Sequence, residues 1–258
     1  MARGSTAGMA LGLGLLAVGS GSGVAAQGAP PTLRVFAAAS MTELVNDLTK
    51  RFTDAKITPS FGASSELARQ IVDGAPADVF VSASPEWIDF LREKNALDGS
   101  AVVFARNELV CIAPHASGLA AKGVHDAATL LEKGLAPGDR VAIADAGVPA
   151  GEYARQALTR LGLIDACRPV LVGQKDVRAV LHAVEQGELQ AGFVYATDAR
   201  VADVELLFPF DPKTHAPIEY LAATVRGSVH AGLAHRFVEF LGSAEARGVL
   251  TQAGFLLP

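Results

Sequence analysis

The fold is decided by the stretch LRVFAAASMTELVNDLTKRF at residues 33–52. Its first part, residues 33–37, is a short apolar run typical of a buried strand. Ser40-Met41-Thr42-Glu43 then has the pattern of a capping box, in which Ser40 caps a helix that continues to about Phe52. A strand followed directly by a helix is the repeating unit of an α/β fold.

The same alternation continues along the chain. Apolar runs predict strands at residues 33–37, 57–61, 78–82, 108–113, 140–144, 169–172, 192–195 and 218–224. Most of them are continuously apolar, as expected for strands buried on both faces of a parallel sheet. Ser84-Pro85-Glu86 and Asp176 predict helix starts, and residues 233–254 predict one or two helices broken near Gly242-Ser243.

The chain has neither an internal repeat nor a long linker. Two lobes would therefore be joined by short crossings, which we expect near residues 105–108 and 200–208. This places residues 32–106 and 205–258 in a discontinuous first lobe and residues 107–204 in a second. Lobes of about 100 residues each are large enough to hold a core.

The N-terminus predicts a signal peptide over residues 1–26. Arg3 is followed by an apolar stretch of Ala, Leu, Gly and Met, and then by Val24-Ala25-Ala26-Gln27. A positive tip, an apolar centre and small residues before the cleavage point are typical of secretion signals. The alternative is a disordered low-complexity tail. Secretion would place the mature chain in an oxidising compartment, where Cys111 and Cys167 either pair or remain buried thiols.

Composition and motifs exclude several classes of function. The net charge is −5 and no basic run is present, which argues against nucleic-acid binding. The sequence has no Gly-x-Ser-x-Gly elbow, no phosphate-binding loop and no His-Glu-x-x-His motif, and its six histidines are dispersed. These features indicate a binding protein and not an enzyme, with neither a cofactor nor a protein-bound metal.

Several strand–helix junctions are small, neutral and rich in hydrogen-bond donors. They contain Ser40, Ser64, Ala150, Val177 and Tyr195. Ligands of open α/β sheets bind beyond the carboxyl ends of strands, where helix N-termini present free N–H groups. Each junction also has a purely structural explanation, since Ser40 and either Ser64 or Ser65 are good helix caps and Tyr195 is a plausible core aromatic.

Six segments resemble one known family, the molybdate-binding proteins of ABC importers. They are VFAAASM (35–41), FGASSELARQI (61–71), GAPADVFVSA (74–83), VPAGEYA (148–154), DVRAVL (176–181) and GFVYATDA (192–199). The resemblance runs from about Leu33 to Phe255. It implies a two-lobed type II periplasmic-binding-protein fold, with a mainly parallel sheet flanked by helices in each lobe and a two-strand hinge.

The resemblance also implies a ligand, a site and a partner. The ligand would be molybdate or tungstate, held as an oxyanion with no direct bond from the protein to the metal. Its donors would be the hydroxyls of Ser40 and Ser64 with nearby N–H groups, the N–H groups of Ala150 and Val177, and the Tyr195 hydroxyl. The protein would be a periplasmic monomer that delivers the ligand to a membrane permease.

Two alternatives remain at this point. The first is a receptor of the same fold for another solute, such as sulfate or an organic acid, although an organic acid would be expected to need an Arg fork. The second is a secreted hydrolase using Ser40 or Ser64, which would need a histidine beside the hydroxyl. For the molybdate site we expect Ser40→Ala and Tyr195→Phe to weaken binding, and Arg178→Ala to change it much less.

Overall fold

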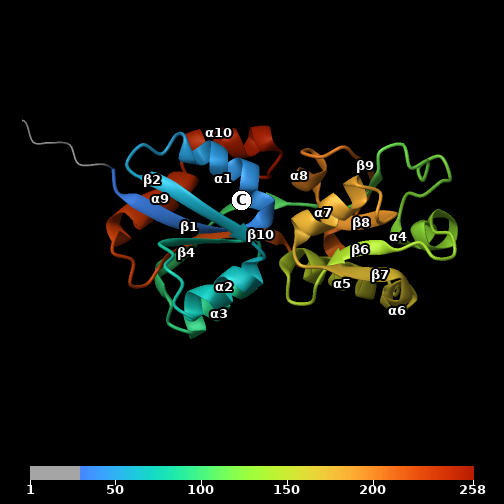
Figure 1. Ribbon diagram of the computed structural model, residues 1–258, viewed down its shortest axis with the longest axis horizontal. Helices are drawn as coiled ribbons and strands as arrows, with labels where there is room; N and C mark the ends of the chain where they lie inside the picture. The colour runs from blue at the N-terminus through green and yellow to red at the C-terminus, as the bar shows by residue number, and fades with distance from the viewer. Residues whose placement is uncertain (1–29) are drawn as a thin grey trace, which may run out of the picture.

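Two five-stranded sheets, each covered by helices, form two lobes that lie side by side (Figure 1). The computed structural model describes residues 30–258, so the predicted signal peptide lies outside the described residues. No helix in this range is long and apolar enough to cross a membrane.

The sheet of lobe 1 has the strand order β2-β1-β3-β10-β4. These strands are β1 (Thr32–Ala38), β2 (Lys56–Gly62), β3 (Val79–Ser82), β4 (Leu97–Asn107) and β10 (Ile218–Val225). Its helices are the 3-10 turn η1 (Ala39–Met41), α1 (Thr42–Thr49), α2 (Ser64–Val72), α3 (Pro85–Glu93), α9 (Ala231–Leu241) and α10 (Ala244–Ala253). Helices α2 and α3 cover one face, while α1 and α10 lie over the other (Figure 1).

The sheet of lobe 2 has the strand order β7-β6-β8-β5-β9. These strands are β5 (Leu109–Pro114), β6 (Val141–Ala144), β7 (Leu171–Gln174), β8 (Ala191–Tyr195) and β9 (Val204–Pro209). The helical segments are α4 (Ala127–Thr129), η2 (Leu130–Gly134), α5 (Pro149–Arg160), α6 (Ile164–Cys167), η3 (Arg168–Val170), α7 (Val177–Glu185), α8 (Ala196–Ala199) and η4 (Pro212–Thr214). Helices α5 and α7 cover opposite faces of this sheet (Figure 1).

Both sheets are mixed, with four strands in one direction and one reversed strand in each, whereas mainly parallel sheets were predicted. In lobe 1, β10 runs antiparallel to its neighbours β3 and β4, and the other strands share one direction. In lobe 2, β5 is the reversed strand. The central strands β3, β6 and β8 are buried along their whole length, which explains their continuous apolar sequences.

The chain crosses between the lobes twice. The first crossing joins β4 to β5 at residues 107–109, close to the predicted position. The second was predicted too early, at residues 200–208 with a lobe boundary at 205. Strand β9 pairs with β5 of lobe 2, so the chain returns only between Pro209 and Ile218. No strand was predicted over β9, because its apolar run at residues 206–208 is short and ends at Pro209, and proline disfavours a strand.

Three predicted helix boundaries are confirmed by their caps. The Ser84 hydroxyl accepts the N–H of Glu86 at the start of α3. The Asp176 carboxylate accepts the N–H of Ala179 at the start of α7. Helices α9 and α10 separate at Gly242, and Ser243 caps α10.

The predicted cap roles of Ser40 and Ser64 are wrong. Ser40 lies in the turn η1, and neither η1 nor α1 has a side-chain cap. Helix α2 begins at Ser64 itself, with Ala63 as its N-cap. Both hydroxyls are therefore available for other contacts.

Cys111 and Cys167 are both buried free thiols. Burial raises the pKa of Cys167 to about 11 and raises that of Cys111 further. Of the two alternatives, the structure has the buried thiols.

Candidate functional site

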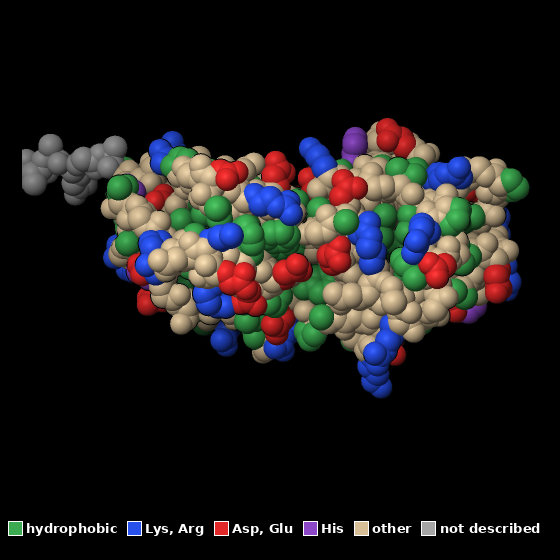
Figure 2. Space-filling view, turned by 90° about the horizontal axis from the view of Figure 1, so that it is seen from below, with side chains coloured by type: hydrophobic (Ala, Val, Ile, Leu, Met, Phe, Trp, Pro, Cys, Tyr) green, Lys and Arg blue, Asp and Glu red, His purple; other side chains and the backbone are tan. Residues whose placement is uncertain are grey.

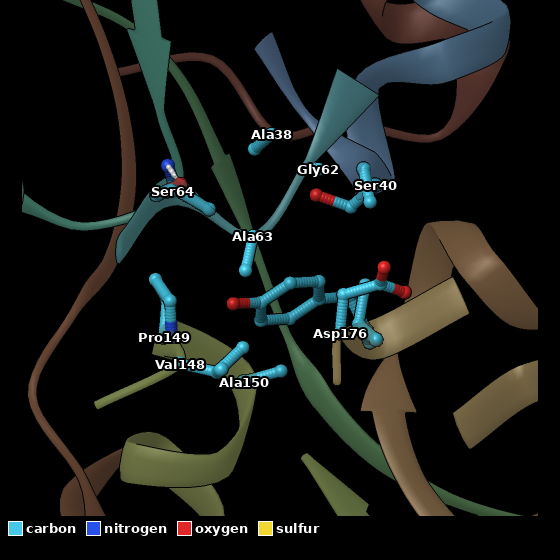
Figure 3. Close-up of a pocket in the computed structure, with 13 residues that line it drawn as sticks. Ala38, Ser40, Gly62, Ala63, Ser64, Val148, Pro149, Ala150 and Asp176 are labelled. Atoms are coloured by element: carbon cyan, nitrogen blue, oxygen red, sulfur yellow. Dashed lines mark hydrogen bonds between the residues drawn. The ribbon is translucent and has the colours of Figure 1, made fainter. Parts of the chain in front are cut away.

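A small cavity with about 220 Å³ of empty space lies between the two lobes. Its lining is Ala38, Ala39, Ser40, Gly62, Ala63, Ser64, Ala83, Val148, Pro149, Ala150, Asp176, Val177 and Tyr195. All five predicted site residues are in this set. In Figure 3, Ser40, Ala63 and Ser64 of lobe 1 face Val148, Pro149 and Ala150 of lobe 2.

Helix N-termini from both lobes open onto this cavity. Helix α2 begins at Ser64, α5 at Pro149 and α7 at Val177. The first N–H groups of a helix have no intrahelical acceptor, and the helix dipole makes this end positive. The N–H groups of Ala150 and Val177, both in first turns, are therefore donors suited to an anion.

Gly151 brings the start of α5 close to strand β6. A Cβ added at Gly151 would lie 2.1 Å from the carbonyl oxygen of Ala144, where ordinary contact begins at 3.4 Å. Only glycine allows this approach, which places the N–H of Ala150 at the cavity.

The hydroxyls of Ser40 and Ser64 are hydrogen-bonded to different segments of lobe 1. Ser64 Oγ accepts the N–H of Ala83 at 3.1 Å, so its own proton remains free. Ser40 Oγ lies 2.9 Å from the hydroxyl of Tyr220, on strand β10. Both serines are almost completely buried, at 3% and 1% exposure for Ser40 and Ser64.

The hydroxyl of Tyr195 is buried and has no hydrogen-bond partner among the described residues. The ring is held edge-on by Tyr153 and Tyr220, with centroid separations of 6.5 and 6.1 Å. Burial raises the pKa of Tyr195 well above its usual value, so the hydroxyl keeps its proton. A buried hydroxyl without a partner costs about 1–3 kcal/mol, so this group indicates a place for a ligand atom.

The cavity lining contains no Lys or Arg, and its one charged residue is Asp176. The Asp176 carboxylate is occupied by the cap of α7. The wider groove nearby is acidic, with Glu86, Asp89 and Glu219 in its wall, and Figure 2 shows Asp and Glu side chains near the junction of the lobes. Positive potential at the site therefore comes from N–H groups and helix ends, and not from cationic side chains.

Side chains outside the cavity join the lobes. Arg178 of α7 forms an ion pair with Glu43 of α1. In a second contact between the lobes, Trp87 Nε1 of lobe 1 donates a hydrogen bond to the carbonyl of Gly147 in lobe 2, at 3.1 Å. The lobes therefore contact each other around the cavity.

Arg178 also contacts a buried carboxylate of its own lobe. Its Nε lies 2.9 Å from Oδ1 of Asp198, close enough for an ion pair but not aligned as a hydrogen bond. Asp198 is completely buried, and burial raises its pKa to about 7 although Arg178 lowers it. Arg178 thus contacts the carboxyl groups of Glu43 and Asp198, and it does not line the cavity.

Three residues around the site were not predicted from the sequence, namely Glu43, Asn107 and Tyr220. Glu43 was assigned to a capping box, but its carboxylate binds Arg178. Tyr220 lies within an apolar strand, where an aromatic residue signals only a core position. No pattern within a few residues of Asn107 or Tyr220 could have linked them to Ser40, because these contacts join segments distant in sequence.

The hydrolase alternative lacks a base in this site. Within residues 30–258, the hydrogen-bond partners of the two hydroxyls are Tyr220 Oη and the backbone N–H of Ala83, and the cavity lining has no histidine. In the same range, no group of three or more His, Cys, Asp or Glu side chains is placed to hold a metal ion.

Known proteins similar to this chain include two curated relatives named molybdate-binding protein ModA. The protein from Haemophilus influenzae is 40% identical over 233 residues, covering 86% of this chain and 88% of its own. The protein from Escherichia coli K12 is 37% identical over 235 residues, covering 87% and 89%.

Solved structures share the fold. The substrate-binding domain of a putative molybdenum ABC transporter from Clostridium difficile is 31% identical, with a TM-score of 0.66 over 88% of this chain and 99% of its own. The periplasmic molybdate-binding protein of Azotobacter vinelandii has a TM-score of 0.76 at 24% identity, over 88% and 99% of the two chains.

The family model described as bacterial extracellular solute-binding protein matches residues 33–256, nearly all of the described chain. With the two-lobed fold and the cavity between the lobes, this match shows that the chain belongs to the bacterial extracellular solute-binding protein family.

Proposed function

We propose that this protein binds molybdate in the periplasm and delivers it to the membrane permease of an ABC importer. The observation that carries the proposal is a cavity lined by neutral donors from both lobes, including the buried hydroxyl of Tyr195, which has no hydrogen-bond partner among the described residues. Relatives at 37–40% identity are named molybdate-binding proteins, and a binding role without covalent chemistry agrees with the family.

Molybdate near neutral pH is a dianion whose oxygens only accept hydrogen bonds. The proposed ligands are the hydroxyls of Ser40, Ser64 and Tyr195 and the N–H groups of Ala150 and Val177. Neutral donors are sufficient, because hydrogen bonds to an anion are stronger than those between neutral groups. Tungstate has the same charge and nearly the same size, so we expect it to bind about as well.

Delivery requires that the ligand stabilise one arrangement of the lobes. Ser40 and Ser64 belong to lobe 1, while Ala150, Val177 and Tyr195 belong to lobe 2. An anion bonded to both sets stabilises the closed arrangement, which the permease then recognises. The predicted signal peptide supports a periplasmic location, and we propose that the protein acts as a monomer.

Isothermal titration of the mature chain with molybdate, tungstate, sulfate and phosphate tests the proposal. We expect tight binding of molybdate and tungstate and much weaker binding of the other two. Phosphate is disfavoured because its O–H finds no acceptor, at a cost of roughly 1–3 kcal/mol. Preferential binding of sulfate would contradict the proposed function. An unchanged molybdate affinity in both Ser40→Ala and Tyr195→Phe would contradict the proposed site.

A further inference from the structure

A chain of hydrogen bonds behind Ser40 begins at the first crossing between the lobes. Asn107 is the last residue of β4, and its Oδ1 accepts the backbone N–H of Glu108 at 2.9 Å. A backbone N–H can only donate, so the side-chain oxygen of Asn107 must face Glu108. The amide nitrogen is thereby directed to the opposite side.

That nitrogen determines the role of the next group. Asn107 Nδ2 donates to Thr197 Oγ1 at 2.8 Å and to Tyr220 Oη at 3.3 Å. The Tyr220 oxygen is therefore an acceptor toward Asn107, and its single proton must point elsewhere. Its other hydrogen-bond partner among the described residues is Ser40 Oγ, at 2.9 Å.

Ser40 is the last group in this chain of hydrogen bonds. Because Tyr220 Oη accepts from Asn107 and has Ser40 Oγ as its remaining partner among the described residues, its proton is directed to Ser40, and the Ser40 proton is left for the cavity that Ser40 lines. Ser64 has the same arrangement, but there the donor is a backbone N–H, that of Ala83. The direction of the Ser40 hydroxyl thus depends on two side chains, Asn107 and Tyr220, neither of which lines the cavity.

We propose that Tyr220, oriented by Asn107, is a positioning residue that makes the Ser40 hydroxyl an obligatory donor and so selects fully deprotonated oxyanions. This inference rests on the proposed oxyanion-binding function. A serine hydroxyl that is free to rotate can accept a hydrogen bond from the O–H of a protonated anion. A hydroxyl held by Tyr220 points its own proton at that O–H, so no hydrogen bond forms. The hydrogen-bond chain therefore contributes to selectivity as well as to affinity.

Two substitutions separate this role from simple packing. Tyr220→Phe keeps the ring, which packs edge-on against Phe255 with a centroid separation of 5.3 Å, and releases the Ser40 hydroxyl. We expect the molybdate Kd to rise by about 2- to 10-fold, the effect of one neutral hydrogen bond. Asn107→Asp supplies an acceptor in place of the donor, so the proton of Tyr220 turns away from Ser40 and Ser40 in turn donates to Tyr220. With a lone pair then facing the anion, we expect a larger loss of about 10- to 150-fold.

Selectivity is the readout that a merely structural role would not change. Selenate and arsenate are tetrahedral and similar in size, but arsenate carries a proton at neutral pH. The ratio of arsenate Kd to selenate Kd should fall by about 2- to 10-fold in Tyr220→Phe, because the released Ser40 can accept that proton. Thr224→Val is the matched control, since it removes a buried hydroxyl from the same strand, one bonded to His235 at 3.2 Å, and should leave the ratio unchanged.

A double variant distinguishes reversal of the hydrogen bonds from repulsion between the new carboxylate and the bound anion. Adding Tyr220→Phe to Asn107→Asp breaks the reversed chain, so molybdate affinity should partly recover. An unchanged selectivity ratio in Tyr220→Phe, or no recovery in the double variant, overturns the inference. If the unmodified protein binds none of the oxyanions, the proposed function itself fails, which is a different result from normal binding with an unchanged ratio.

Discussion

Replacing Tyr195 by Phe should have opposite effects on the empty protein and on its complex with molybdate. With the lobes in contact as in this structure, Tyr195 is 1% exposed and its hydroxyl has no hydrogen-bond partner within residues 30–258. Such a group destabilises that arrangement by about 1–3 kcal/mol. Removing it should shift the empty protein toward closure, by a factor of roughly 5 to 150 in the ratio of closed to open molecules.

The complex should respond in the other direction. A hydrogen bond to a charged group contributes about 1.5–3 kcal/mol, so the molybdate Kd of Tyr195→Phe should rise by about 10- to 150-fold. Small-angle X-ray scattering of the empty protein would measure closure, and isothermal titration would measure the Kd. Thr224→Val, which removes a buried hydroxyl that already has a partner, should change neither quantity. The reasoning is refuted if Tyr195→Phe binds molybdate within twofold of the unmodified protein and its empty form is no more compact.

Three further predictions concern the scaffold around the cavity. Gly151→Ala should lower the free energy of unfolding by about 1–3 kcal/mol and weaken molybdate binding, because its Cβ must push α5 away from β6. By contrast, Gly248→Ala in α10, where a Cβ meets nothing within 4 Å, should raise the free energy of unfolding by about 0.4–1 kcal/mol; urea titrations of both variants measure the difference. Glu43→Gln removes the partly exposed ion pair with Arg178, so titration should show a molybdate Kd raised by no more than about 5-fold, and a much larger change would mean that this pair controls closure. The pKa of buried Asp198 is about 7 in the folded protein, above its ordinary value of 3.8, so its contribution to stability is lost as pH rises from about 4 to about 7. Urea unfolding across this range should show Asp198→Asn gaining stability relative to the unmodified protein as pH rises, and a constant difference would contradict the raised pKa.

Patterns within a few residues predicted much of the architecture. The alternation of apolar runs and capped helices specified an α/β fold, because burial on both faces of a sheet demands continuous apolar strands. The caps at Ser84 and Asp176 were readable for the same reason, since each bonds a group two or three residues away. The residues of the donor-rich junctions, Ser40, Ser64, Ala150, Val177 and Tyr195, line one cavity.

Contacts between segments distant in sequence could not be predicted from local sequence patterns. The partner of Ser40 is Tyr220, which is 180 residues away and becomes its neighbour only because β10 returns to the sheet of lobe 1. The late return of the chain after Pro209 depends likewise on the pairing of β9 with β5. Local sequence determines which groups can donate, because that is a property of residue type and helix position. The tertiary structure alone decides which of them meet, which lack a partner and which way a hydroxyl proton points, because a hydrogen bond depends on distances and directions that only packing sets.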